Sequence, residues 1–203
     1  MSAEGARPTF YYDFNSPYAY LAAERINTMF DPPPVWQPIA LWFVLQHHNR
    51  TPWSMQPDTK EPGMREIERR ASERGLPAIR WPEGWPEETY GLTSLRAAVF
   101  AQQSGRAEAF SLAAFRQMFA AGRSLADEDN VLLAAAACEL HPRAVLKAVE
   151  TRGVKDGLRK ATDEAIERGV VGVPTVAVND ELFWGDDRLE EADAVARAAA
   201  GAG

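Results

Sequence analysis

The hydrophobic period of this 203-residue chain changes twice, and that change constrains its fold more than any other feature of the sequence. Strand-like patterns occur only near the two ends. Between them, from about residue 42 to residue 168, apolar side chains recur at spacings of three and four, which is typical of helices. The pattern therefore predicts an α/β fold into which a large helical segment is inserted.

The N-terminal part reads as a strand, a helix and a second strand. Residues 9–14 are rich in aromatic side chains and stop abruptly, as a buried strand does. Ser16 is a suitable N-cap and Pro17 suits the first helical position, so a helix is expected to begin here and to continue toward Phe30. Residues 35–41 form the predicted second strand, which completes a βαβ unit.

The middle segment is predicted to be helical, with one irregular loop. That loop, residues 76–90, holds Trp81, Trp85 and three prolines. Its tryptophans either anchor the loop in the core or line a substrate site, and the sequence leaves both readings open. The expected helices cover residues 64–74, 93–103, 107–121, 127–139, a segment from 143, and 155–168.

The C-terminal part returns to strand periodicity. Val173 to Val178 and Leu182 to Trp184 flank Asn179-Asp180, a pair that tolerates the positive φ of a hairpin turn. A final helix over residues 188–199 follows, with acidic residues at its start. The expected order is β-α-β, helical insertion, β-β-α.

Composition excludes some partners and suggests a compartment. The net charge of −7 and the isoelectric point near 5.1 disfavour nucleic acid. No stretch approaches the roughly 18 consecutive apolar residues of a spanning helix, so a membrane is not expected as a partner. Residues 1–8 lack a basic region followed by an apolar one, and a cytoplasmic location is the resulting expectation.

Cysteine and histidine are scarce. The single cysteine, Cys138, excludes an internal disulfide and a cluster of thiolate ligands, and its apolar surroundings favour a buried side chain over a reactive thiol. His47 and His48 are adjacent and are expected to point apart on a helix, and His141 stands alone. No metal site is predicted.

Three positions at segment starts have a structural reading from the residues alone. Ser16 either caps the first helix or presents its hydroxyl at the positive helix end, where a thiolate is favoured. Val173-Pro174 reads as an ordinary edge-strand start. Asp186 and Asp187 read as an acidic helix start.

Three motifs together carry a resemblance to a known family. They are Asp-Phe-Asn-Ser-Pro-Tyr-Ala-Tyr-Leu-Ala at 13–22, Gly-Val-Pro-Thr at 172–175 and Phe-Trp-Gly-Asp-Asp-Arg-Leu at 183–189. In this order they resemble the 2-hydroxychromene-2-carboxylate isomerase and kappa-class glutathione transferase group of the DsbA-like thioredoxin superfamily. The resemblance implies a thioredoxin-like domain formed by residues 1–41 and 169–203, with a helical insertion domain at 42–168.

The resemblance also implies a thiol-binding site. Ser16 matches the position of the nucleophilic cysteine of the redox enzymes and Ala19 that of the second cysteine, so two-cysteine redox catalysis is not expected. The implied cofactor is glutathione or another low-molecular-weight thiol. It would pair with the backbone of Val173 before a cis Pro174. Further implied contacts are the acidic residues Asp186 and Asp187, and, as less secure matches, Asn49 and Lys60.

The expected function is a thiol-dependent isomerase acting on a small aromatic or conjugated carbonyl compound. Tyr18, Trp42, Trp81 and Trp85 are the expected walls of the substrate pocket. A glutathione transferase or peroxidase and a non-catalytic binding protein stay open as alternatives, because the segment from Lys60 to Ile67 departs from the group's pattern. Members of the group often dimerise through the helical layer, which makes a homodimer an expectation from the resemblance.

Overall fold

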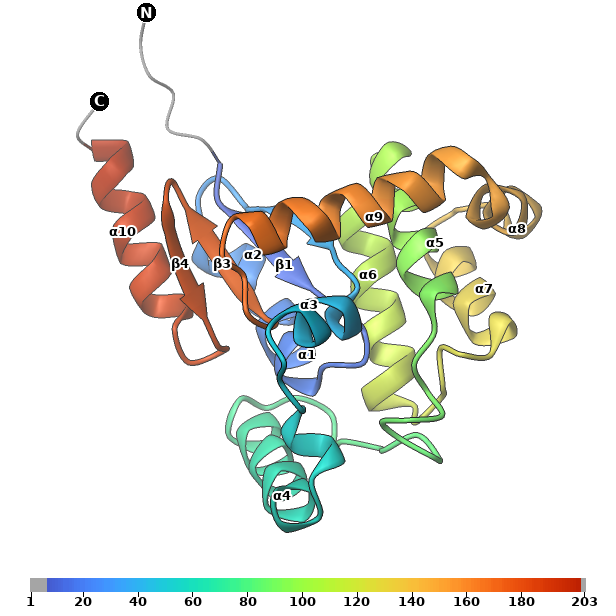
Figure 1. Ribbon diagram of the computed structural model, residues 1–203, viewed down its shortest axis with the longest axis horizontal. Helices are drawn as coiled ribbons and strands as arrows, with labels where there is room; N and C mark the ends of the chain where they lie inside the picture. Colours follow the sequence, from blue (N-terminus) through green and yellow to red (C-terminus); the bar gives the residue numbers. More distant parts are fainter. Residues whose placement is uncertain (1–6, 202–203) are drawn as a thin grey trace, which may run out of the picture.

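A four-stranded sheet lies at the centre of the computed structural model, which describes residues 7–201 (Figure 1). The strand order is β2-β1-β3-β4. β1 pairs in parallel with β2 and antiparallel with β3, and β3 pairs antiparallel with β4. The strands are β1 (Thr9–Tyr12), β2 (Val35–Pro38), β3 (Thr175–Val178) and β4 (Glu181–Trp184). This arrangement confirms the predicted α/β, thioredoxin-like order of elements.

The first helix begins where the sequence predicted. Ser16 is its N-cap and accepts a hydrogen bond from the backbone N–H of Ala19, and Pro17 occupies the first turn. The single helix expected up to Phe30 is instead two short ones, α1 (Pro17–Ala23) and α2 (Ile26–Met29). The second strand is also shorter than predicted, because the backbone turns into helix α3 (Leu41–His47).

Both faces of the sheet are covered, and the alternation of side chains along β1 shows how. Phe10 and Tyr12 are buried in the larger core cluster together with residues of α1 and α10 (Leu189–Gly201). Tyr11 points to the other face, where it is buried with Val44 of α3 and Ala165 of α9 (Arg152–Glu167). The sheet is therefore enclosed between helices, and its loops at one end are left to form a site.

The central segment is helical, as predicted, and extends to the right of the sheet in Figure 1, with α4 as a separate projection below it. The loop 76–90 contains no helix or strand, again as predicted. The remaining elements of the central segment are η1 (Trp53–Met55), α4 (Pro57–Glu73), α5 (Leu92–Gln103), α6 (Ala107–Phe115) continued by the π-helical turns η2 (Arg116–Ala120), α7 (Glu128–Ala137) and α8 (Pro142–Glu150).

One buried cluster runs through both parts of the chain. It joins Phe14 of the N-terminal segment to Phe110 and Phe115 of α6, with Phe14 and Phe115 centroids 5.0 Å apart. The division into a thioredoxin-like unit and an insertion unit stays a prediction. Among the residues described, no helix is both long and apolar enough to cross a bilayer.

Candidate thiol-binding site

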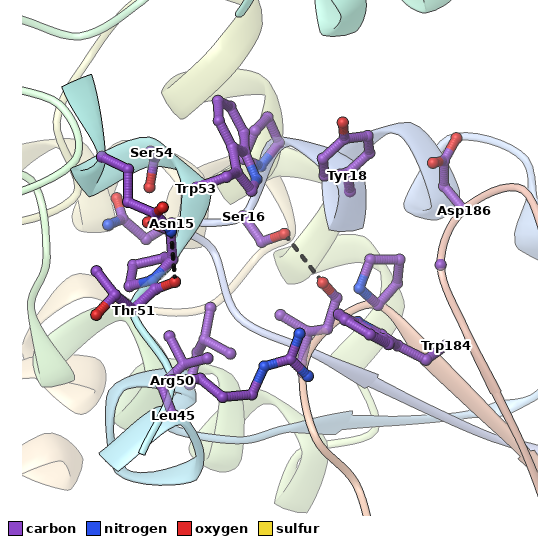
Figure 2. A pocket seen from close by; sticks show the side chains of 18 of the residues that line it. Asn15, Ser16, Tyr18, Leu45, Arg50, Thr51, Trp53, Ser54, Trp184 and Asp186 are labelled. Carbon is purple, nitrogen blue, oxygen red and sulfur yellow. Dashed lines mark hydrogen bonds between the residues drawn. The ribbon is translucent and has the colours of Figure 1, made fainter. Parts of the chain in front are cut away.

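A cavity of about 470 Å³ opens at the end of the sheet where β1 meets α1 (Figure 2). Segments distant in sequence form it: the start of α1, the loop from α3 to η1, the loop before β3 and the turn after β4, with Arg70 of α4 and Trp85 of the loop 76–90. Predicted site residues that line it are Ser16, Tyr18, Trp85, Val173, Pro174, Asp186 and Asp187. The fold thus brings together the three motifs that the sequence singled out.

Ser16 lies at the inner wall of this cavity. Its side chain is only 7% exposed, and its hydroxyl is 3.4 Å from the carbonyl oxygen of Val173, to which it donates. Because Oγ also accepts from Ala19 N–H at 3.2 Å, the oxygen is held in place while its proton is weakly engaged. The hydroxyl can therefore turn toward a ligand atom in the cavity (Figure 2).

Val173 and Pro174 form the opposite wall. The peptide bond between them is cis, as the resemblance implied. Pro174 has its carbonyl bonded to Gly185 N–H at 2.9 Å, which connects this wall to the turn after β4. Both residues face the start of α1 across the cavity.

Asp13 is a buried carboxyl beneath the site that the sequence reading did not single out as functional. Its Oδ1 accepts from Asn15 N–H and its Oδ2 from Leu41 N–H, each at 2.9 Å. Burial raises the pKa of Asp13 to about 6, and these hydrogen bonds, with one from Tyr90, offset only part of that effect. Asp13 thereby fixes the starts of both α1 and α3 beside the cavity.

Asp186 is not a free carboxylate at the helix start. It is 1% exposed and contacts two arginines of the insertion: Arg70 Nη1 donates to Oδ1 at 2.7 Å, and Arg74 Nη2 lies 2.6 Å from Oδ2. The second contact is an ion pair that lacks the angle of a hydrogen bond. Asp187, next along the chain, is exposed and lines the cavity.

Aromatic rings form much of the remaining wall. Tyr18 and Trp53 pack edge to face with centroids 5.9 Å apart, and Trp53 lies 5.7 Å from Trp85. Trp85 is buried and donates its indole N–H to the carbonyl of Asn15 at 3.2 Å. Trp85 therefore anchors its loop and also lines the cavity, while its contact with a substrate stays a prediction.

Four predicted residues lie outside the cavity lining. Asn49 is exposed at the end of α3, and Lys60 on α4 pairs with Glu87 at 3.8 Å. The exposed side chain of Trp42 and the ring of Trp81 also lie outside the lining; Trp81 packs behind Trp85 with centroids 4.5 Å apart. Roles for these residues in binding stay predictions.

Several residues that line the cavity were not predicted from the sequence. Arg50, Trp53 and Trp184 line the cavity, as does Arg70, whose guanidinium lies 5.5 Å from the ring of Tyr18. The signal available for Arg50 was its place next to Asn49, a residue already matched to the family. Trp184 stands in the third motif, but its place in the cavity, like that of Arg70, depends on contacts between segments distant in the chain.

The histidines and the cysteine have contacts of their own. His48 shares a hydrogen bond with the Val170 carbonyl at 3.1 Å, and His141 accepts from Arg143 N–H as the N-cap of α8. The rings of His47 and His48 are 4.9 Å apart, so the expectation that they point apart was wrong. Cys138 is buried, and burial raises the pKa of its thiol. Within residues 7–201 no group of three His, Cys, Asp or Glu side chains is placed to hold a metal ion.

The fold and the three assembled motifs define a thioredoxin-like protein without the redox cysteines. The family model of the DSBA-like thioredoxin domain matches residues 9–195, and the chain belongs to this family. Among curated proteins, a 2-hydroxychromene-2-carboxylate isomerase of Sphingobium xenophagum is 29% identical over 188 residues, which cover 89% of this chain and 93% of the relative.

Solved structures show the same fold. That of a 2-hydroxychromene-2-carboxylate isomerase matches with a TM-score of 0.82 at 22% identity and covers 95% of both chains. A probable DsbA oxidoreductase of Streptomyces coelicolor matches with a TM-score of 0.71 at 21% identity, over 95% of this chain and 90% of the other. These similarities confirm the resemblance predicted from the sequence.

Proposed function

We propose that this chain is a thiol-dependent isomerase of small conjugated carbonyl compounds, of the 2-hydroxychromene-2-carboxylate type. The thiol would be glutathione or another low-molecular-weight thiol. The observation that carries the proposal is the Ser16 hydroxyl, which stands beside the Val173 carbonyl in an aromatic-walled cavity. Ala19 in the second cysteine position leaves no partner for a disulfide at this site. Similarity to an isomerase over most of the chain supports the same reaction type.

The residues present fit a thiol. The contact from the Ser16 hydroxyl to Val173 is long at 3.4 Å, so a thiolate in the cavity would receive a stronger, charge-assisted hydrogen bond from the same proton. Ala19 N–H holds the oxygen in the orientation that this requires. When bound, the thiol supplies a sulfur that adds reversibly to a conjugated double bond, so that the bond can rotate as a single bond and no reagent is consumed.

The chain's own residues have three tasks in this reaction. Ser16 stabilises negative charge on the sulfur by donating its proton into a hydrogen bond. The main chain at Val173 positions an extended thiol peptide alongside it. Tyr18, Trp53 and Trp85 offer flat apolar surface for a conjugated substrate and exclude water from the reacting atoms.

Replacement of Ser16 by alanine tests the proposal. With 2-hydroxychromene-2-carboxylate as substrate, we expect turnover by the wild type to require added glutathione and the Ser16→Ala variant to be slower by about 100-fold, the usual effect of losing one donor to a developing anion. Ser72→Ala, at an exposed position of α4, is the matched control and should keep full activity. Turnover that needs no thiol, or equal rates for Ser16→Ala and wild type, contradicts the proposal.

The transferase alternative uses the same thiol site and is separated by substrate. A glutathione transferase would consume glutathione in step with an electrophile that carries a leaving group, such as 1-chloro-2,4-dinitrobenzene. An isomerase leaves the glutathione concentration unchanged. Thiol titration during each reaction therefore distinguishes the two, and binding without either reaction would point to a non-catalytic protein.

A further inference from the structure

The Arg50 guanidinium is a cavity cation without a carboxylate partner among residues 7–201. Arg70, which lines the same cavity, is neutralised by Glu66 and Asp186 at 2.6 and 2.7 Å. Arg50 instead lies over the ring of Trp184, 4.4 Å from its centroid, and its Nη1 is 3.5 Å from the carbonyl of Val171. Its positive charge is thus available to a ligand.

The backbone directs Arg50 to this place. Helix α3 ends with Asn49 in the left-handed region at φ 51°, and the next residue, Arg50, donates its N–H to the carbonyl of Leu45 at 2.9 Å. Together with the Asn49 N–H bond to Gln46 at 3.1 Å, this is a Schellman termination. It turns the chain sharply at the cavity's edge, and Figure 2 shows the Arg50 side chain extending toward Trp184.

Trp184 provides the surface on which Arg50 rests. A Cβ on Gly172 would lie 2.8 Å from Trp184 Nε1, so the indole occupies space that only glycine leaves open. A guanidinium over an aromatic ring keeps its N–H edge available while its face is covered. Such an edge matches the two oxygens of a carboxylate.

We propose that Arg50 binds a carboxylate of the ligand that occupies the cavity beside Ser16. The inference deepens the proposed function and rests on it, because it assigns the cavity an acidic ligand. A chain with net charge −7 repels anions at long range, so an acidic ligand needs a local cation at its site. The carboxylate belongs either to a thiol peptide such as glutathione or to a conjugated acid substrate. The N–H edge of the Arg50 guanidinium can bind the two carboxylate oxygens of either one.

Acid and ester pairs of each ligand separate the two sources. One pair is glutathione and a glutathione ester blocked at the glycine carboxylate; the other is 2-hydroxycinnamate and its ethyl ester. Calorimetry measures the affinity of all four for the wild type and for Arg50→Gln. Arg152→Gln, on the exposed start of α9, is the control for loss of one positive charge. Thermal unfolding establishes that each variant is folded.

We expect the wild type to bind the acid of one pair at least about tenfold more tightly than its ester, the loss typical of a charged hydrogen bond. Arg50→Gln should bind that acid and ester equally, while Arg152→Gln behaves as the wild type. Arg50→Lys, which keeps the charge without the planar fork, should recover part of the preference.

The acid and ester pair whose acid preference is lost in Arg50→Gln identifies the ligand that supplies the carboxylate. The inference is overturned if the acid preference of both pairs is the same in Arg50→Gln as in the wild type, or if the wild type shows no acid preference or binds neither acid. None of these measurements depends on turnover. Loss of thiol-dependent isomerisation would therefore count against the proposed function while the 2-hydroxycinnamate pair still tests Arg50.

Discussion

At the scale of single residues, Asp13 shows how the site is held. It is buried, and it accepts hydrogen bonds from the backbone N–H of Asn15, just before α1, and of Leu41, the first residue of α3. By bonding to both segments, the carboxyl group fixes the position of Ser16 relative to the start of α3. The arrangement has an electrostatic cost, because burial disfavours the charged form more than these hydrogen bonds favour it.

This cost predicts a pH dependence of stability. The folded-state pKa of Asp13 is raised to about 6 from 3.8, so the folded state binds the proton more tightly than the unfolded state. Its contribution to the free energy of unfolding is therefore fully present below pH 3.8 and is lost as the pH rises through about 6. The difference in unfolding free energy between wild type and Asp13→Asn should fall by about 2 kcal/mol between pH 4 and 7.

Urea denaturation at several pH values measures this difference. Asp58→Asn, at an exposed position in the first turn of α4, controls for the loss of a carboxylate at the surface. The slope against pH is the readout, because the baseline stability of Asp13→Asn also reflects its altered hydrogen bonds to Asn15 and Leu41. Parallel curves for wild type and Asp13→Asn would show that Asp13 does not titrate in this range.

Single-residue roles were predictable where a local signal exists. Ser16 precedes Pro17 at a strand end, and that pair alone predicts an N-cap, as the structure confirms. Arg50 has no such signal, because its role depends on Trp184, which reaches it only through the folded sheet. The two arginines that neutralise Asp186 were missed for the same reason.

At the scale of elements, the termination of α3 decides where the next segment enters the cavity. Asn49 was predicted as a cofactor-binding residue, and the structure gives it a backbone task at φ 51°. Asparagine and glycine adopt this left-handed conformation at low cost, whereas alanine does not. The hydrogen bond from Arg50 N–H to Leu45 depends on it.

The predicted result is a contrast between two substitutions. Asn49→Gly should leave the free energy of unfolding within about 0.5 kcal/mol of wild type, and Asn49→Ala should lower it by about 1 kcal/mol. Only Asn49→Ala should also weaken binding of the acid that Arg50 recognises. Chemical denaturation and calorimetry measure the two effects. If both variants lose affinity equally, the Asn49 side chain itself contacts the ligand.

Element boundaries were predictable where turn residues are local. The Asn179-Asp180 hairpin turn was located correctly, with Asn179 at φ 51°. Helix α4 starts at Pro57, earlier than the predicted start at residue 64, and continues through Pro62, a residue that normally disfavours the helix interior. Tertiary contacts there override local preference: the helix packs against η1 and α1.

At the scale of the whole molecule, the cavity exists only because the helical insertion closes onto the sheet. Trp53 and Trp85 of the cavity wall belong to the insertion, while Ser16 and Val173 belong to the two flanking segments. Sequence periodicity predicted that such an insertion exists. It could not predict how the insertion docks, since the contact that ties α4 to the turn after β4 joins Arg70 and Asp186, which are 116 positions apart.

The contacts of Asp186 with Arg70 and Arg74 yield the last prediction. Replacing Asp186 by asparagine leaves Arg70 and Arg74, both mostly buried, without their shared counter-charge. We expect a loss of about 3 kcal/mol in the free energy of unfolding, the lower end for a broken buried ion pair, since both arginines keep some solvent contact. The neighbouring Asp187→Asn, at an exposed position, should change it by less than about 0.5 kcal/mol.

Urea denaturation of both variants measures the contrast, and glutathione affinity separates structure from binding. If Asp186 fastens the insertion to the turn after β4, its variant loses stability first and affinity only as a consequence, whereas Asp187→Asn loses affinity at full stability. Equal stability of Asp186→Asn and wild type, with a selective loss of glutathione affinity, would instead assign Asp186 to the ligand. Because Arg70 also contacts Tyr18, the same cluster transmits the position of α4 to the cavity wall.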